Sequence, residues 1–111
     1  MQDNYIKVKN ITDTDMAITE EQGFKLRAEI EKVINNNNKI ILDFDGINIF
    51  TTTFFSASIG YYVLKLSPKK CSDIFVLKNL SKAGKNAYHY SFENAKHCFF
   101  QLLFNWRLKA V

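Results

Sequence analysis

The spacing of apolar positions alternates between two periods along this chain. Residues 5–10, 39–45 and 73–78 hold short apolar runs that are typical of strands, and residues 16–18 add a briefer extended piece. Within residues 19–34 and 54–66, apolar side chains recur every three or four positions, as they do on one face of a helix. Strands that alternate with helices in this way predict βαβ units and a parallel sheet.

Local signals mark the ends of the first predicted helix. Thr19 can cap its N-terminus, and Gln22 follows three residues later, which is the spacing of a capping box. The asparagines at positions 35–38 end the helix, because Asn readily adopts the left-handed conformation found at helix C-termini. We therefore expect an amphipathic helix that packs one side against a sheet.

The clearest predicted strand is residues 39–45. Its nearly continuous run of Ile40, Ile41, Leu42 and Phe44 is typical of a central strand buried on both faces. Residues from 81 onward are mostly helical by pattern, either as one long helix or as two, since Ser91 could begin a second. The sequence predicts a small α/β sandwich with three or four mostly parallel strands and three or four helices.

Size and charge narrow the class of protein. The 111 residues make one domain, and 47% apolar with 23% charged residues excludes disordered and collagen-like chains. Residues 1–60 carry six basic and nine acidic side chains, a net charge of −3, whereas residues 61–111 carry nine and two, a net of +7. The basic half either solvates exposed faces or attracts nucleic acid, an acidic protein or a membrane surface. Nucleic acid is the weaker of these possible partners because the lysines are not interleaved with arginine or glycine.

Residues with metal-binding or redox chemistry are few. The two cysteines cannot make a disulfide framework, and with no signal peptide at the N-terminus they predict a reduced, cytoplasmic location. We expect Cys71 in a loop and Cys98 in the core. His89, Glu93 and His97 share one helical face, which we interpret as an exposed polar stripe rather than a metal site. No segment reaches the roughly 20 apolar residues that a membrane-spanning helix needs, so we expect no membrane partner.

The sequence shows no combination of residues that predicts catalysis. Asp43 and Asp45 stand at a strand end, where we expect hydrogen bonds to loop backbone, with cation binding or acid-base work as the alternative. No nucleophile-base pair, phosphate-binding glycine loop, zinc cluster or dinucleotide fingerprint accompanies them. We therefore expect neither enzymatic activity nor a cofactor.

One stretch resembles a known family. Residues 42–60, LDFDGINIFTTTFFSASIG, resemble the central signature of STAS domains, the fold of bacterial anti-sigma-factor antagonists. Together with EEQGFKLRAEI at residues 20–30, they are similar to a bacterial STAS-like family of unknown function. The resemblance extends over residues 15–100 and implies a STAS-like α/β fold.

The resemblance also implies a function and a set of residues. In the antagonists, a serine at a helix start is phosphorylated by a kinase that doubles as an anti-sigma factor. The segments match so that Thr52 takes the place of that serine and Thr53 that of the next one, which makes both candidate phosphoacceptors. The implied function is that of a regulatory module that contacts an ATP-binding kinase or anti-sigma-like protein. Its partner surface is expected at Asp45, Gly46, Thr51, Phe54 and Ser56.

These residues depart from the antagonist pattern and have a simpler interpretation. Thr51 replaces the acidic residue of the motif, and Phe54 and Ser56 replace its two glycines. Independently of the resemblance, a threonine at a helix start commonly caps the helix.

The C-terminal helix, predicted over residues 91–109, is hydrophobic around most of its circumference. One sheet face cannot cover such a helix. Either it forms a homodimer or partner interface, or it packs more deeply across the domain. The interface residues would be Phe99, Phe100, Leu103 and Trp106. Two alternative functions therefore remain, a nucleic-acid-associated accessory protein that uses the basic half and a structural homodimer subunit.

Overall fold

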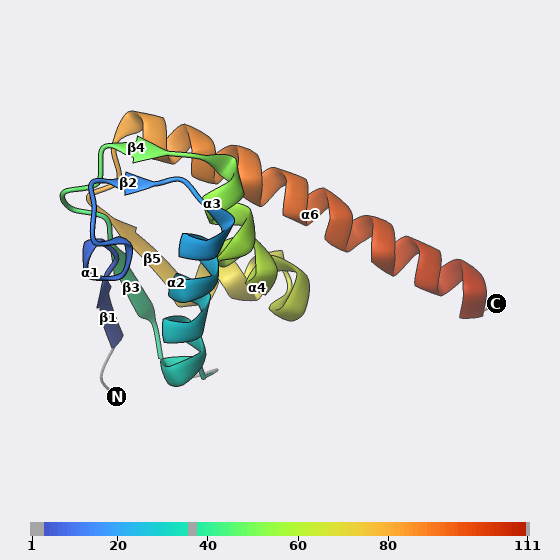
Figure 1. The fold of residues 1–111 in the computed structure, drawn as a ribbon. Helices are drawn as coiled ribbons and strands as arrows, with labels where there is room; N and C mark the ends of the chain where they lie inside the picture. The colour runs from blue at the N-terminus through green and yellow to red at the C-terminus, as the bar shows by residue number, and fades with distance from the viewer. Residues whose placement is uncertain (1–3, 36–37, 111) are drawn as a thin grey trace.

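The computed structural model describes residues 4–35 and 38–110, and in it the chain forms an α/β fold with two parallel sheets (Figure 1). The larger sheet contains β1 (Asn4–Lys7), β3 (Ile40–Asp43) and β5 (Phe75–Lys78) in the order β1-β3-β5. The smaller sheet pairs β2 (Met16–Ala17) with β4 (Ile49–Phe50). The predicted fold class and the parallel strand pairing are confirmed.

Six helices occur in the described part of the chain, more than the three or four expected. They are α1 (Lys9–Thr12), α2 (Glu20–Val33), α3 (Thr52–Ala57), α4 (Ile59–Leu66), α5 (Pro68–Ile74) and α6 (Lys82–Ala110). The unexpected ones, α1 and α5, are short and follow a strand or another helix directly. Neither is long enough to show a hydrophobic period in the sequence.

The predicted capping box at the start of α2 is confirmed. Thr19 Oγ1 accepts a hydrogen bond from Gln22 N at 3.1 Å, and Gln22 Oε1 accepts one from Thr19 N at 3.0 Å. At the other end, the helix closes at Ile34, whose backbone is extended. Of the four asparagines expected to end this helix, those at positions 36 and 37 lie outside the described residues.

Helices cover only one face of the larger sheet. Its strands are added in one direction, and right-handed crossovers in a single direction place their helices on the same side. Ile40 and Leu42 are fully buried on that side, whereas Ile41 on the opposite face is only partly buried. Tyr5 of β1, which pairs with Ile41, is exposed. The expectation that residues 39–45 are buried on both faces is therefore wrong for the outer face.

The single helix predicted over residues 54–66 is divided in two. The chain bends at Ser58, whose φ of −101° and ψ of −88° are not helical, and Ser58 Oγ donates to the Phe54 carbonyl at 2.8 Å. Pro68 follows α4, as predicted, and also occupies the first turn of α5. Cys71 therefore lies inside a helix and is completely buried, not in a loop as expected.

An aromatic cluster fills the space between the sheet and the helices. Phe55 lies at its centre, with ring centroids 5.4–5.8 Å from those of Phe44, Phe50, Phe54 and Tyr88. Phe54 and Phe55 are both completely buried. The cluster joins β3, β4, α3 and α6 into one core.

Helix α6 is one continuous helix, so of the two arrangements left open by the sequence the single helix is observed. Its 29 residues span about 43 Å at 1.5 Å per residue. Gly84 allows its first turn to cross close to β4, because a Cβ there would lie 2.9 Å from Cε2 of Phe50. The first half packs on α3 and α4, and the second half projects away from the rest of the domain (Figure 1).

Candidate functional site

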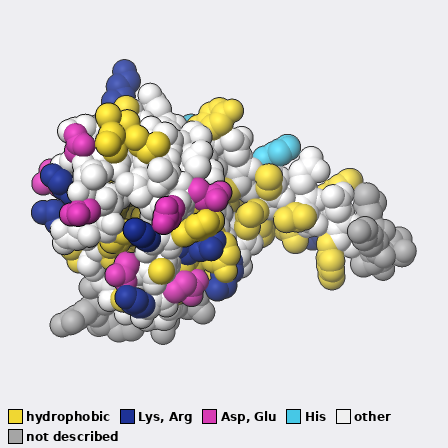
Figure 2. All heavy atoms as spheres, in the orientation of Figure 1, with side chains coloured by type: hydrophobic (Ala, Val, Ile, Leu, Met, Phe, Trp, Pro, Cys, Tyr) yellow, Lys and Arg dark blue, Asp and Glu magenta, His cyan; other side chains and the backbone are white. Residues whose placement is uncertain are grey.

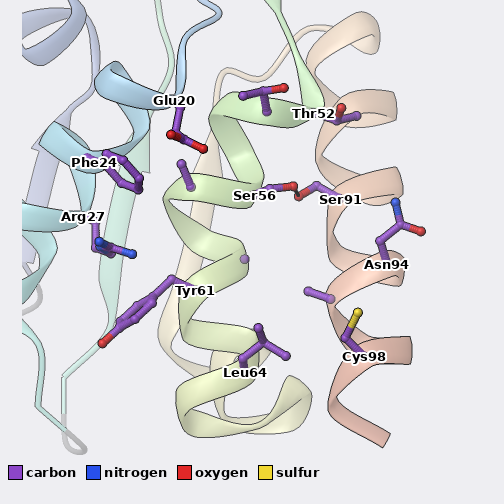
Figure 3. Close-up of a pocket in the computed structure, with 14 residues that line it drawn as sticks. Glu20, Phe24, Arg27, Thr52, Ser56, Tyr61, Leu64, Ser91, Asn94 and Cys98 are labelled. Carbon is purple, nitrogen blue, oxygen red and sulfur yellow. Dashed lines mark hydrogen bonds between the residues drawn. The ribbon is translucent and has the colours of Figure 1, made fainter. Parts of the chain in front are cut away.

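A groove of about 570 Å³ lies between α2 and α6, with α3 and α4 as its floor (Figure 3). We refer to it as the α2–α6 groove. Phe24 and Arg27 contribute one wall, Asn94 contributes to the other, and Ser56 and Leu64 rise from the floor. The groove combines an apolar surface with a few hydroxyl and amide groups, a mixture typical of binding sites.

Small residues determine the depth of this groove. A Cβ at Gly23 would lie 2.6 Å from the Ala57 Cβ and 2.7 Å from the Phe54 carbonyl oxygen, so only glycine lets α2 approach α3 this closely. On the other side, Ser56 Oγ and Ser91 Oγ share a hydrogen bond of 2.8 Å that joins α3 to α6. Ser91 is therefore a buried contact within α6 and does not begin a helix.

Aromatic rings hold the α2 wall in place. The guanidinium carbon of Arg27 lies 4.8 Å from the centroid of the Phe24 ring and 4.3 Å from that of Tyr61, within cation–π range of both. Deeper, the buried Tyr62 hydroxyl donates to Glu31 Oε1 at 2.9 Å. That hydrogen bond lowers the pKa of the Glu31 carboxyl, while burial raises the pKa of Tyr62. The wall thus carries a cation positioned against two aromatic rings.

The three consecutive threonines have different environments. Thr51 caps α3, since its Oγ1 accepts from Phe54 N at 3.2 Å and its hydroxyl donates to the Ile18 carbonyl. Thr52 and Thr53 lie in the first turn of α3 and line the α2–α6 groove. Neither of their hydroxyls has a hydrogen-bond partner among the described residues, and Thr53 is exposed. Capping therefore uses Thr51 and leaves the other two hydroxyls unused by the cap, with Thr53 exposed and Thr52 partly buried.

The expected partner surface is only partly assembled. Ser56 lies in the groove, but Asp45 and Gly46 form an exposed turn after β3 and do not line it. Gly46 has a φ of +85°, a conformation that favours glycine. The inclusion of Phe54 is wrong, because its side chain is completely buried and cannot contact a partner. A phenylalanine replaces the glycine of the antagonist motif here without adding bulk to the surface.

Asp43 is the centre of a hydrogen-bond network that the sequence did not reveal. Its carboxylate accepts from the Tyr5 hydroxyl, from Asn79 Nδ2 at 2.8 Å and from Asp45 N at 3.0 Å. The bond from Tyr5, followed by that from Asn79, lowers the pKa of Asp43. The expected hydrogen bond to loop backbone is present, and the carboxylate also links β1 to the segment after β5. The sequence could not predict this network because it does not give the register of the sheet, which places Tyr5 near Asp43.

The remaining sequence candidates are the polar residues of α6 and the two cysteines. His89, Glu93 and His97 are exposed on α6, and no group of three or more potential metal ligands occurs among residues 4–35 and 38–110. Cys98 was expected in the core, but it is exposed at the edge of the groove. Burial raises the pKa of the Cys71 thiol to about 12, so its reactive thiolate form is disfavoured.

Charge and hydropathy add two observations about the surface. Lys65 and Lys69 of the basic half form ion pairs with Glu31 and Asp73, at 3.4 and 3.1 Å. Part of the positive charge is therefore compensated. Within the described ranges, no helix has both the length and the apolar content needed to cross a membrane.

The aromatic residues near the C-terminus do not wrap across the domain. Phe100, Leu103 and Trp106 are exposed, and only Phe99 is partly buried. Of the two arrangements left open by the sequence, deeper packing across the domain is therefore wrong for these three residues. An interface role for them remains a prediction.

A family model described as a STAS-like domain of unknown function (DUF4325) matches residues 22–85, more than half of the chain. The chain belongs to this STAS-like family. The matched part of this STAS-like domain runs from α2 into the first turn of α6, so it includes Thr52, Thr53 and most of the groove. The projecting half of α6 lies outside the match. Neither the curated proteins nor the solved structures provide a match to the chain.

Proposed function

We propose that this STAS-like domain is a non-catalytic regulatory module that binds a protein partner in the α2–α6 groove. The observation that carries the proposal is the position of Thr52 and Thr53. Both come from the signature segment of the family, and both line a groove whose walls include the exposed apolar side chains of Phe24 and Leu64. A groove with this combination can bind an apolar segment of a partner and be altered by modification of its own hydroxyls.

The groove offers distinct contacts for each part of a partner. Phe24 and Leu64 supply apolar area, which provides most of the favourable energy of association. Arg27, held between two rings, can donate to a carboxylate of the partner without losing much side-chain freedom. The partner suggested by the family resemblance is an ATP-binding kinase or anti-sigma-like protein.

Phosphorylation of Thr52 or Thr53 would then work as a release switch. A phosphate adds roughly −1.5 to −2 charges at neutral pH. Glu20 lines the same groove, so the added charge joins an existing negative one and places a hydrated group against an apolar surface. Both effects oppose the binding of an apolar or acidic segment.

The decisive experiment is affinity purification of the tagged chain from its own host, with mass spectrometry of the partners and of the peptide that contains residues 51–53. Leu64→Glu should abolish recovery of an ATP-binding partner, whereas Ile49→Glu should retain it. Ile49 is equally apolar and exposed but does not line the groove. Thr53→Glu should weaken capture, and Thr53→Val should not.

Other outcomes would contradict the proposal. If Leu64→Glu and wild type recovered the partner equally well, the groove would not be the binding site. If Thr52 and Thr53 were unmodified in every preparation, regulation by phosphorylation would be contradicted. Recovery of nucleic acid in place of a protein, with binding that falls steeply as salt rises, would support the alternative that uses the basic half.

A further inference from the structure

The projecting half of α6 leaves an unusual amount of apolar surface in water. Among the described side chains beyond Cys98, five large apolar ones are exposed. Yellow spheres mark apolar side chains on this projection in Figure 2. Their exposed fractions are 52% for Phe100, 62% for Leu102, 42% for Leu103, 61% for Phe104 and 67% for Trp106. Since a buried aromatic side chain covers about 150–250 Å², these residues together expose about 500 Å². That is as large as the largest apolar patch on a typical monomer, and such patches commonly mark interfaces.

The spacing along α6 identifies which face is built for contact. Successive apolar or long-stemmed residues follow one another at intervals of four, three, four and three, the pattern of a coiled-coil seam. This α6 seam consists of Phe92, Lys96, Phe99, Leu103 and Trp106. Its first three residues also line a cavity of about 450 Å³ against Pro68 and Ser72 of α5. The seam therefore begins in a hollow on the body and ends on the projection.

We propose that two copies of this chain associate through the α6 seam in antiparallel orientation, the projecting end of each lying against the hollow beside α5 of the other. A second copy is the occupant because one molecule carries both the apolar projection and the apolar hollow, as an isologous two-fold interface requires. Leu103 and Trp106 of each copy, with Phe100 beside them, supply the exposed apolar side chains of this interface, a common use of such a patch. The groove residues of α6, Ser91, Asn94 and Cys98, face away from the seam and stay free.

Charge selects the antiparallel orientation. Glu93 and Arg107 flank the seam on the same side, seven residues before and seven after Phe100, and neither forms an ion pair within the described residues. A two-fold axis at Phe100 places Arg107 beside the partner's Glu93. The same register places Lys96 of the partner subunit within two residues of the position opposite Trp106, close enough for a cation–π contact. A parallel pair would instead align like charges, Lys96 with the partner's Lys96 and Arg107 with the partner's Arg107.

Light scattering and sedimentation of the full-length protein test the association. Wild type should show a concentration-dependent dimer, and Leu103→Glu and Trp106→Glu should shift it to monomer at every concentration studied. Both side chains lie beyond the body, so circular dichroism should show no loss of fold. Gln101→Glu introduces the same charge on the opposite face of the helix and should leave the dimer intact. A wild type that stays monomeric, or a dimer that Leu103→Glu does not disrupt, would overturn the proposal.

Cross-linking tests the orientation separately. In a Cys98→Ser background, the double variant Glu93→Cys, Arg107→Cys should form a covalent dimer in the presence of copper phenanthroline. Each single cysteine should not, because in an antiparallel pair each residue and its copy lie about 21 Å apart along the axis, 14 residues at 1.5 Å each. Efficient cross-linking of the single variants would show a parallel pair and contradict the model. The dimer and the α2–α6 groove use different residues, so failure of either proposal leaves the other testable.

Discussion

Both halves of α6 carry aromatic side chains, but the environments of these side chains are opposite. In the first half, Tyr88 and Phe92 pack against the core, with the Tyr88 ring 5.5 Å from that of Phe55. In the second half, Phe104 and Trp106 have no other element beside them and are exposed. Helix formation depends on local hydrogen bonds and continues through both halves, whereas burial requires a neighbouring element. An aromatic residue in a helix is therefore not evidence of a core position.

The largest expected difference between the core and the projecting half of α6 is in the free energy of unfolding lost when an aromatic ring is removed. Phe55→Ala should lower the free energy of unfolding by about 3–5 kcal/mol, because it opens a cavity at the centre of the aromatic cluster. Phe104→Ala should change it by no more than about 0.5 kcal/mol, since its ring does not contact the body. Urea denaturation measures both, at a protein concentration low enough to exclude a dimer. A comparable loss in the two variants would mean that the projecting half contributes to the core after all.

The Asp43 network should contribute less than the aromatic cluster but more than a surface charge. Asp43→Ala removes the acceptor for Tyr5 and Asn79 and should cost about 2 kcal/mol. Asp45→Ala, two residues away and exposed, is the matched control and should leave stability within about 0.5 kcal/mol of wild type. Chemical denaturation at neutral pH provides the comparison, and equal losses would show that the network does not stabilise the sheet.

The same network predicts a pH dependence. The pKa of Asp43 is lowered in the folded state, so its contribution is fully present above the ordinary aspartate pKa of about 3.9 and is lost as the pH falls through the folded value. The difference in stability between wild type and Asp43→Asn should therefore stay constant from neutral pH down to about pH 4 and should narrow as the pH falls further. A gap that stays constant from neutral pH into the acidic range would contradict the hydrogen-bonded carboxylate.

Substitution of the neighbouring threonines should cause a smaller difference in the free energy of unfolding. Thr51→Ala removes the cap of α3 and should cost about 1 kcal/mol, while Thr53→Ala should cost no more than a few tenths. Thermal unfolding of the two variants gives the comparison. Because the Thr53 hydroxyl has no hydrogen-bond partner within residues 4–35 and 38–110, any loss of partner binding in its variants can be assigned to the groove rather than to unfolding. An equally large loss of stability for Thr53→Ala would remove that advantage.

The two cysteines differ in exposure, so their reactivity compares two regions of the molecule without a measurement of stability. Cys98 is exposed near the start of the projection and should react rapidly with a thiol reagent. Cys71 is buried, with its pKa raised to about 12, and should react only on the timescale of unfolding. A colorimetric thiol titration should therefore find one rapid equivalent in the native protein and two in denaturant. Rapid reaction of both would show that α5 opens readily.

Features encoded locally could be predicted from the sequence. The capping box of Thr19 and Gln22, the turn at Gly46 and the strand at residues 39–45 each depend on a few adjacent residues. The alternation of strands with helices was sufficient to predict the α/β class. The stretch at residues 42–60 was sufficient to predict the family. The division of one expected helix at Ser58 was missed, because a side chain that bonds to the carbonyl four residues earlier is compatible with both a bend and a straight helix.

The sequence by itself determined the α/β class, the parallel arrangement of the strands and the capping box at the start of α2. The tertiary structure alone decided that Phe54 is buried, that Cys98 is exposed and that Gly23 lets α2 form one wall of a groove. It also decided that half of α6 projects beyond the body. Backbone hydrogen bonds and caps act over a few residues and so leave a sequence pattern, whereas burial depends on what the rest of the chain places alongside.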